Sequence, residues 1–452
     1  MGDNIVIKIP EQVNRVLEIL GSNGHTAYVV GGACRDIFMG RAIHDWDVAT
    51  SAKPEETIAA FSEYRVIETG VKHGTVTVLI DGEPIEITTY RIEGEYSDNR
   101  HPDSVEFTNR IEDDLSRRDF TVNAIAYSPH LGTADPFGGV ADIEKKIIRC
   151  VGDADTRFSE DGLRILRALR FASVLGFDIE AETAASIKRN RELLKNISVE
   201  RIFVEISKLL CGDNAAAVLD EYSDVIFYVY PELEAMKGCT QNHERHVSDV
   251  WGHSLKALES IAAEPELRWA ALLHDSGKPA NKTTDENGVD HFYRHADKSR
   301  EIADNIFLRM KTSNAFRKRV CALIKNHDFL PDKLSVKTYR KALADYGYET
   351  VLDFFRIREA DIRAQNPVFL EEGLAANRKG LETVERIRQE DSCFRIKDLK
   401  INGKDLINIG IPQQPIMSRI LSTLLDEVMG DLIENEKEAL LKRAVELKKG
   451  DG

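Results

Sequence analysis

Residues 44–50, HDWDVAT, place two aspartates on either side of a tryptophan in a run that favours a strand. In an extended chain alternate side chains share a face, so Asp45 and Asp47 would point the same way. Like charges side by side repel unless a positive charge lies between them. Because carboxylate oxygens are the ligands that Mg²⁺ prefers, we predict a magnesium site here. An exposed strand edge is the alternative interpretation.

A glycine pair precedes the aspartates, in the stretch YVVGGACRD. At Gly31 and Gly32 the missing side chains would let backbone N–H groups approach an anion. Arg35 follows three residues after Gly32 and could clamp phosphate oxygens with two hydrogen bonds. A glycine pair alone marks an ordinary turn equally well. Combined with D-x-D ten residues after Arg35, it indicates a triphosphate site beside bound metal.

A second chemical pattern lies in EDGLRILRALR, which we expect to be one helix. Asp161 and Arg164 are three residues apart and would be neighbours on one face. An acceptor beside a fork of donors can match the Watson–Crick edge of a base. Such a pair would select a nucleotide without a nucleic-acid template, although a surface ion pair has the same spacing.

Histidines cluster later in the chain, in the stretches DVWGHSLKAL, LRWAALLHDSGKP, HFYRHADKS and ALIKNHDFL. These stretches resemble the HD-domain phosphohydrolases, in which imidazoles and carboxylates hold metals that activate water for attack on phosphoesters. The resemblance implies the ligands His253, His274, Asp275 and Asp328, with His295 and His327 as further candidates. Isolated surface histidines are the alternative.

The composition limits the class of protein. A chain of 452 residues suggests roughly three domains. The net charge of −15 disfavours a nucleic-acid binder unless basic residues are concentrated locally. The sequence contains no apolar run long enough for a membrane span, no signal-peptide pattern and no C-x-x-C pair. We therefore expect a cytoplasmic protein with reduced thiols that binds no membrane.

Helix and strand signals alternate in the first part of the chain and give way to helices. QVNRVLEIL predicts a helix, and TAYVVGG, YRVIETG, GTVTVLIDG and PIEITTYRI predict strands. IDGEP predicts a hairpin turn, and EGEYSDNRHPD predicts a polar loop. We predict an α+β fold with a mixed sheet, divided into a head (1–145), a helical neck (146–235), an HD-like helical body (236–345) and a helical tail (346–452).

Six stretches occur one after another along the chain, and together they are more specific than any one motif: YVVGGACRDIFMGRAIHDWDVAT, ETGVKHGTVTV, IEITTYR, SRRDFTVNAIAY, DPFGGVADI and RFSEDGLRILRALRFASVLGF. They resemble the motifs of class II tRNA nucleotidyltransferases, the CCA-adding enzymes and their bacterial poly(A) polymerase relatives. The resemblance implies a polymerase-β-like head in which Asp45 and Asp47 hold Mg²⁺. It implies that Gly32, Arg35 and Arg118 bind the nucleotide and that Asp119 and Asn123 shape the site around the ribose. Glu86 is either a third carboxylate or a surface strand residue.

In the neck, the resemblance implies that Glu160, Asp161 and Arg164 select CTP and then ATP. Arg167 and Arg170 match further nucleotide-contacting positions. The loop EGEYSDNRHPD corresponds to an element needed for the final A, so its presence favours full CCA addition or A addition alone. The expected function is template-independent addition of CCA to the 3′ end of tRNA from CTP and ATP, with pyrophosphate released. The tail is expected to contact tRNA.

The sequence alone is also compatible with other functions. One is an A-adding tRNA nucleotidyltransferase or a poly(A) polymerase. Another is an HD phosphohydrolase whose head only binds nucleotide, with a divalent metal in the body. A non-catalytic RNA-binding module fits poorly with the acidic charge. The oligomeric state is not indicated by any pattern.

Overall fold

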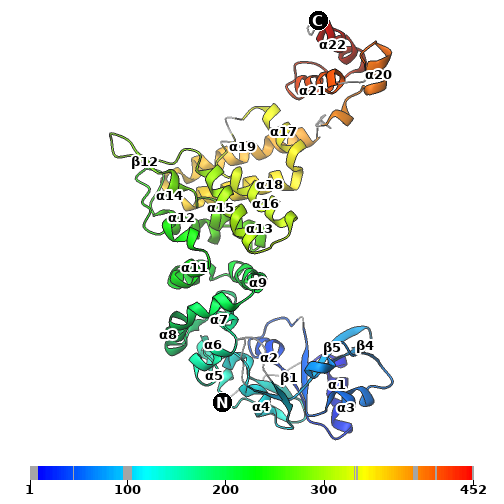
Figure 1. Cartoon of the computed structure of the whole chain (residues 1–452), viewed down its shortest axis with the longest axis vertical. Coiled ribbons are helices and arrows are strands. Elements are labelled where there is room, and N and C mark those ends of the chain that lie inside the picture. The colour runs from blue at the N-terminus through cyan, green and yellow to red at the C-terminus, as the bar shows by residue number, and fades with distance from the viewer. Residues whose placement is uncertain are drawn as a thin grey trace. The chain divides into compact units, whose positions relative to one another are not determined.

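The computed structural model describes residues 9–43, 45–94, 104–329, 331, 334–389, 395–412 and 415–449. The chain divides into two compact units, Met1–Pro231 and Glu232–Gly452. The first unit holds the main sheet, drawn in blue and cyan in Figure 1, and the second is almost entirely helical. This arrangement confirms the predicted α+β fold class. Within the described residues, every helix is too short or too polar to cross a membrane.

A seven-stranded sheet forms the head, in the order β3-β4-β5-β2-β1-β8-β9. Strand β2 lies parallel to β5 but antiparallel to β1, so the sheet is mixed as predicted. The strands are β1 (Ala27–Val30), β2 (Asp47–Thr50), β3 (Arg65–Ile67), β4 (Thr75–Ile80), β5 (Glu83–Thr89), β8 (Ala126–Ser128) and β9 (Gly132–Ala134).

The predicted IDGEP hairpin joins β4 to β5. Asp81 and Gly82 both have positive φ, at 53° and 90°, which is the conformation of a type I′ turn. Ile80 pairs with Glu83 across it, so the turn sets the register of both strands. Alternate residues of β4 are buried as a result, and they pack in one apolar core with α1 (Glu11–Ser22) and the sheet.

The first unit contains further helices and short strands besides the sheet. In the predicted head segment they are α2 (Gly31–Phe38), α3 (Pro54–Ala60), η1 (Val71–His73), β6 (Arg91–Glu93), β7 (Val105–Phe107), α4 (Ile111–Ser116), η2 (Thr121–Asn123) and α5 (Gly139–Lys145). In the neck they are β10 (Ile147–Ile148), α6 (Ala154–Glu160), α7 (Leu163–Leu175), β11 (Asp178–Ile179), α8 (Ala181–Asn190), η3 (Arg191–Asn196), α9 (Val199–Leu210), α10 (Ala215–Glu221) and α11 (Ser223–Val229). Most of the predicted loop EGEYSDNRHPD, residues 95–103, lies outside the described residues.

The second unit is built from helices packed around buried aromatic side chains such as Trp251 and Trp269. Helix α18 packs against α12 and α13, so the chain beyond residue 345 contributes to the body. The elements are η4 (Pro231–Met236), α12 (Val250–Glu259), α13 (Pro265–Leu273), α14 (Lys278–Asn281), β12 (Thr283–Thr284), β13 (Asp290–His291), α15 (His295–Arg309), α16 (Asn314–Lys325), α17 (Val336–Tyr346), α18 (Tyr348–Ala364), η6 (Pro367–Phe369), α19 (Leu370–Gln389), η7 (Ile396–Asp398), α20 (Gly403–Asn408), α21 (Pro415–Met429) and α22 (Lys437–Lys449).

Candidate functional site

Three carboxylates meet at the start of strand β2. Asp47 is the first residue of β2 and lies opposite Glu86 on β5, with Asp45 two residues earlier. Asp45, Asp47 and Glu86 line a cavity of about 790 Å³. Trp46 packs against the apolar core instead, as the alternation of an extended chain predicts.

The pKa of Asp47 is raised above its usual range. Removal from water is the largest cause, and the negative charge of Glu86 raises the pKa further. Arg118 lowers it, whereas Asp45 raises it again. Such a group of oxygen ligands, held together against its own repulsion, fits a hard divalent cation such as Mg²⁺.

The glycine pair forms the first turn of a helix. Strand β1 ends at Val30, and Gly31 and Gly32 begin α2. Gly31 has φ of +69°, and a Cβ there would lie 3.0 Å from Nη1 of Arg118. Glycine is therefore required both by the backbone and by the close approach of a guanidinium. A helix N-terminus also favours an anion.

A second cavity, of about 560 Å³, opens beside the carboxylates. Asp47 lines both cavities, so the carboxylates border a strongly cationic space. Most of the nucleotide-binding residues predicted from the sequence line this second cavity, and only Glu160 is not among its lining residues: the lining includes Gly32, Arg35, Arg118, Asp161, Arg164, Arg167 and Arg170.

A chain of hydrogen bonds orients two of these arginines. Arg35 donates from Nη1 to Oδ1 of Asn123 at 2.8 Å, and Asn123 donates to Asp119 at 3.0 Å. Arg167 donates from Nε and Nη2 to the other oxygen of Asp119, at 2.8 and 2.5 Å. Burial alone would raise the pKa of Asp119, but Arg167 and the hydrogen bonds outweigh it and hold the pKa below its usual range. Asp119 and Asn123 therefore position arginines in addition to lining the cavity.

The ring of Phe171 is a shared support for three guanidinium groups. Those of Arg35, Arg167 and Arg170 lie 5.3, 5.4 and 4.3 Å from its centre. Arg170 also forms an ion pair with Glu205 of α9 at 3.0 Å. Sequence reasoning missed Phe171 and Glu205, because an apolar residue and an acid in amphipathic helices carry no separate signal.

Asp161 does not lie on the same helix as Arg164, contrary to our expectation of one continuous helix. Helix α6 ends at Glu160, and Asp161 adopts an extended conformation before α7 begins at Leu163. Its carboxylate accepts the N–H of Leu163 at 3.0 Å, a local bond that aspartate forms more readily than it continues a helix. Both residues nevertheless line the cationic cavity.

Other groups hold this pair in place. Arg201, which sequence reasoning missed, donates to Oδ2 of Asp161 at 2.9 Å. Arg164 forms an ion pair with Glu160 and donates to the carbonyl oxygens of Arg157 and Arg117, at 3.0 and 3.1 Å. An acceptor and a donor fork are thus fixed side by side at the cavity wall.

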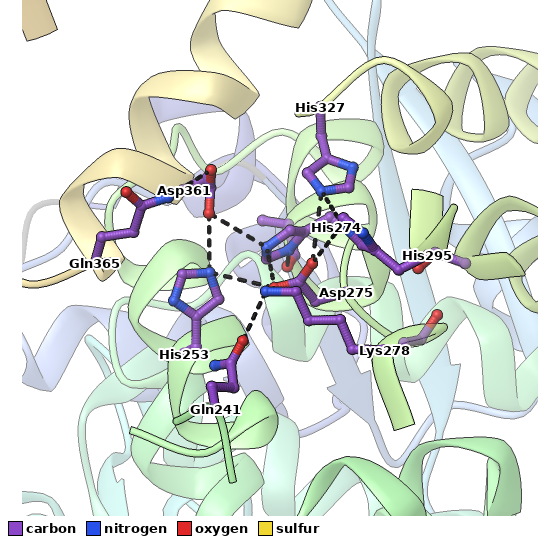
Figure 2. A network of polar contacts seen from close by, with 12 residues as sticks. Gln241, His253, His274, Asp275, Lys278, His295, His327, Asp361 and Gln365 are labelled. Atoms are coloured by element: carbon purple, nitrogen blue, oxygen red, sulfur yellow. Dashed lines mark hydrogen bonds and ion pairs between the residues drawn. The ribbon is translucent and has the colours of Figure 1, made fainter. Parts of the chain in front are cut away.

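The second unit contains a buried group of histidines and aspartates (Figure 2). His253 on α12 lies 2.9 Å from Asp361 on α18. His274 and Asp275 follow α13, with His274 Nε2 3.2 Å from Asp275 Oδ2. His295 and His327 approach the other oxygen of Asp275, at 3.3 and 3.5 Å. The predicted residues His253, His274 and Asp275 are therefore brought together.

Asp361, rather than the predicted Asp328, lies with these histidines. The ligand atoms of His253, His274 and Asp361 lie within 4.8 Å of one another, as do those of His274, Asp275 and His327. Asp328 is exposed, and it lines the neighbouring cavity of about 380 Å³ without joining either group. In READIRAQ the aspartate looks like one more charge on a polar helix, and only its place on the buried face of α18 could have signalled a ligand.

Both buried aspartates of this group have pKa values well below the usual range. Burial would raise them, but for Asp275 the charges of His274 and Lys278 outweigh it, and for Asp361 the hydrogen bond from His253 and the charge of Arg358 do so. Lys278 Nζ lies 2.7 Å from Asp275 Oδ2, and Arg358 lies 2.5 Å from Asp361. A set of ionised carboxylates and imidazoles of this kind fits a divalent transition metal.

Two stretches of the chain concentrate basic residues, as local RNA contact would require, but their arginines have acidic partners. In IKRNRELLKN, Arg189 pairs with Asp155 and Arg191 with Asp224, at 3.0 and 3.1 Å. In NAFRKRV, Arg319 forms an ion pair with Asp353. These arginines are therefore partly neutralised within the chain.

Family models match most of the chain in three parts. The model described as the poly A polymerase head domain matches residues 27–149. A model of a probable RNA and SrmB-binding site of polymerase A matches residues 176–236, and a model of tRNA nucleotidyltransferase domain 2 matches residues 283–444.

Individual proteins match over nearly the full length. The CCA-adding enzyme of Geobacillus thermodenitrificans is 36% identical over 95% of both chains. That of Ligilactobacillus salivarius is 37% identical over 98% of both. Among solved structures, the Bacillus stearothermophilus CCA-adding enzyme in complex with CTP has 30% identity and a TM-score of 0.76 over 98% of both chains. A Thermotoga maritima CCA-adding enzyme complexed with tRNA shares the fold, with 19% identity and a TM-score of 0.61 over 98% of this chain and 97% of that one.

Proposed function

The chain belongs to the CCA-adding enzymes, a family of tRNA nucleotidyltransferases, and from this premise we propose that it adds C, C and A in turn to the 3′ end of tRNA. CTP and ATP are the proposed substrates, selected by amino-acid side chains without a nucleic-acid template. We expect the reaction to take place in the cytoplasm.

The position of Asp47 is the observation that supports this proposal most strongly. It lies on the boundary between a carboxylate-lined cavity and a cavity lined by arginines. Nucleotidyl transfer needs this juxtaposition, because the reacting phosphorus must lie next to a metal site while the triphosphate charge is neutralised.

The reaction follows from the side chains on each side of Asp47. The 3′-hydroxyl of the tRNA gives up its proton to water, its oxygen forms a bond to the α-phosphorus, and the bond from that phosphorus to the pyrophosphate oxygen breaks. Arg35, Arg118 and the first N–H groups of α2 hold the triphosphate and the departing pyrophosphate. Asp45 and Asp47 would hold magnesium, with Glu86 as a third carboxylate on the same cavity wall. Two Mg²⁺ ions bound there would acidify the attacking hydroxyl and stabilise the leaving group.

Base selection is assigned to Asp161 and Arg164. Their acceptor and donors can pair with the Watson–Crick edge of cytosine or adenine, as side chains do when they read bases elsewhere. Arg201 and Glu160 hold the two groups in place. Arg167 and Arg170 border the same space and complete the proposed nucleotide site.

A stepwise assay tests the proposal. The purified protein is incubated with tRNA ending before the first C, after CC and after CCA, with CTP or ATP alone or with both. We expect two C residues from CTP, one A on the CC substrate from ATP, and no addition after CCA. An A-adding enzyme would fail on the first substrate, and a poly(A) polymerase would make long A tails.

Substitutions of the two aspartates test their assignment as magnesium ligands. Asp45→Ala and Asp47→Ala should each abolish transfer while the far-ultraviolet circular dichroism stays unchanged. Glu182→Ala, which changes an exposed carboxylate on α8, is the matched control. Retained CCA addition in either aspartate variant would refute the assignment.

A second function is favoured by the buried histidines and aspartates. We propose that the second unit is a metal-dependent phosphohydrolase, in which His253, His274, Asp275 and Asp361 hold a divalent cation. Water would add its oxygen to phosphorus, and the ester oxygen would leave with a proton. The body would then extend beyond residue 345 to include α18, which carries Asp361; the four-segment division otherwise stays a prediction.

An assay of phosphoester hydrolysis tests this second function. The substrates are p-nitrophenyl phosphate and a 2′,3′-cyclic nucleotide, each measured with Mg²⁺, Mn²⁺, Co²⁺, Ni²⁺ and Zn²⁺. Activity should disappear in His253→Ala and persist in Asp47→Ala. No hydrolysis with any of the five metals would overturn it, and the assignment of the head would be unaffected.

A further inference from the structure

The ring of Phe171 lies among three arginines that come from two helices of the first unit. Arg35 belongs to α2, and Arg167 and Arg170 belong to α7, as Phe171 does. Their guanidinium carbons are 5.3, 5.4 and 4.3 Å from the centre of the ring. We propose that Phe171 is a positioning residue for nucleoside triphosphates, and that the π electrons of its ring, rather than its apolar bulk, hold these guanidinium groups ready for the phosphates. This inference rests on the nucleotidyltransferase function proposed for the first unit and adds a residue to its nucleotide site.

The three distances are those of cation–π contacts. The face of an aromatic ring is negatively polarised and attracts a cation within about 6 Å of its centre. The attraction is stronger where water is excluded, and Phe171 is only 8% exposed. An aliphatic side chain of similar size would fill the same space without attracting the guanidinium groups.

The ring of Phe171 is itself held in one orientation. The fully buried ring of Phe120 packs against it edge to face, with 5.8 Å between the ring centres and 81° between the planes. This is one of the preferred geometries of an aromatic pair. Phe120 directly precedes η2, so the predicted head segment fixes a ring that the predicted neck segment carries.

Arg170 depends on the ring more than the other two arginines do. It lies nearest to the ring centre, and its Nε is 3.0 Å from Oε2 of Glu205. Neither of these two atoms has a hydrogen-bond partner within the described part of the chain. Arg167, in contrast, donates two hydrogen bonds to Asp119. The ring therefore supplies the contact that places Arg170 at the cavity wall.

An aromatic ring suits an anion site because it attracts cations without cancelling their charge. Arginines outnumber aspartates among the described residues that line the cavity. Burial lowers the pKa of Arg170, Glu205 raises it, and the charges of Arg167 and Arg35 help to hold it below its usual value, which reflects repulsion within the group. Another carboxylate in place of the ring would relieve this repulsion but would remove positive charge that a triphosphate needs.

The ring should act on the phosphates and not on the choice of base. Asp161 and Arg164, the proposed base-reading pair, are held by other groups, Arg201 and Glu160. Weakening the ring should therefore reduce the affinity for CTP, for ATP and for inorganic triphosphate, which has no base, by the same factor. The preference for CTP over UTP should not change.

Stepwise fluorination of this one ring separates electronic attraction from packing. Fluorine withdraws electrons from the ring face and changes the size of the ring little. Full-length protein is prepared with one, two or three fluorine atoms on the ring of Phe171. We expect KM for CTP and for ATP to rise with each fluorine, by about tenfold over the series, while kcat changes less. The dissociation constant of inorganic triphosphate, measured by calorimetry, should rise in parallel at an unchanged thermal unfolding midpoint.

The same fluorination at Phe177 is the matched control, because that ring is 3% exposed and lies outside the cavity lining. It should leave KM and the triphosphate affinity unchanged. The variant Phe171→Leu, which lacks the ring, should weaken binding at least as much as three fluorine atoms do.

Three results would overturn the proposal. Constant affinity over the fluorine series, with weaker binding only in Phe171→Leu, would show that the ring acts by packing. A fall in KM on fluorination would show that the ring competes with the nucleotide for the guanidinium groups. An equal rise at Phe177 would assign the effect to fluorine in any buried ring. If the wild type incorporated neither CTP nor ATP, the proposed function would fail, whereas the affinity for inorganic triphosphate would still decide the role of the ring.

Discussion

Asp119 binds Arg167 through two hydrogen bonds to one carboxylate oxygen, at 2.8 and 2.5 Å, although the residues are 48 positions apart in the chain. Asp119 precedes η2 in the head segment, and Arg167 lies on α7 in the neck segment. Through Asn123, the same carboxylate is connected to Arg35. The side chain proposed to contact the triphosphate and the helix proposed to read the base are therefore held by one buried acid.

Replacing Asp119 should loosen both arginines at once. In Asp119→Asn the buried ion pair is lost, and we expect the free energy of unfolding to fall by about 2–3 kcal/mol because Arg167 is left without its counter-charge. Incorporation of UTP or GTP should rise relative to CTP. Glu182→Gln breaks an exposed ion pair with Arg189 and should cost less than about 1 kcal/mol with no change in nucleotide choice. Unchanged selectivity in Asp119→Asn would contradict the positioning role.

The same variant should change the response to acid. Because the pKa of Asp119 is depressed in the fold, its ionisation stabilises the protein above the usual aspartate pKa of 3.8, and this contribution is lost as the pH falls below that value. Urea unfolding of the wild type between pH 5 and pH 3 should therefore show a steeper loss of stability than unfolding of Asp119→Asn. Parallel curves would refute the assignment.

Glu86→Gln tests the third carboxylate. Removing its charge should lower the pKa of Asp47, and the chelated protein should become slightly more stable at neutral pH because repulsion is reduced. The Mg²⁺ concentration for half-maximal C addition should rise several-fold if Glu86 helps to hold the cation. Glu83→Gln, on the same strand and cavity wall, is the matched control. Equal Mg²⁺ dependence in the two variants would remove Glu86 from the site.

Gly31→Ala and Gly24→Ala separate backbone strain from contact with the site. Both glycines have positive φ, at 69° and 84°, so each substitution should cost about 1–2 kcal/mol. Only at Gly31 does the new Cβ meet Arg118, because nothing lies within 4 Å at Gly24. We expect about a tenfold rise in KM for CTP in Gly31→Ala, corresponding to about 1.4 kcal/mol, and none in Gly24→Ala. Equal KM values would show that Arg118 adjusts freely.

Arg201→Met tests whether Arg201 positions the base-reading pair. Asp161 would lose its 2.9 Å ion pair, so we expect the ratio of correct to incorrect nucleotide incorporation to fall while kcat for CTP changes less. Arg191→Met removes an exposed ion pair with Asp224 and should leave this ratio unchanged. A fall in kcat without a change in selectivity would indicate a structural role for Arg201 instead.

Local patterns predicted local structure well in the head. The IDGEP hairpin, the mixed sheet and the inward-facing Trp46 follow from turn chemistry and from the alternation of strand side chains. The prediction for Asp161 was wrong in detail, because a helical spacing cannot reveal that its carboxylate accepts the N–H of Leu163 and separates α6 from α7.

The sequence by itself determined the family, the α+β class and the identity of most polar groups in the head, because these depend on ordered motifs and short-range periodicity. Only the tertiary structure decided which partners complete each site. From helices that look ordinary in sequence, Phe171, Arg201 and Asp361 contact Arg35, Asp161 and His253, and these contacts join positions far apart in the chain. A carboxylate becomes a ligand through burial and neighbours, and those are set by how the helices pack.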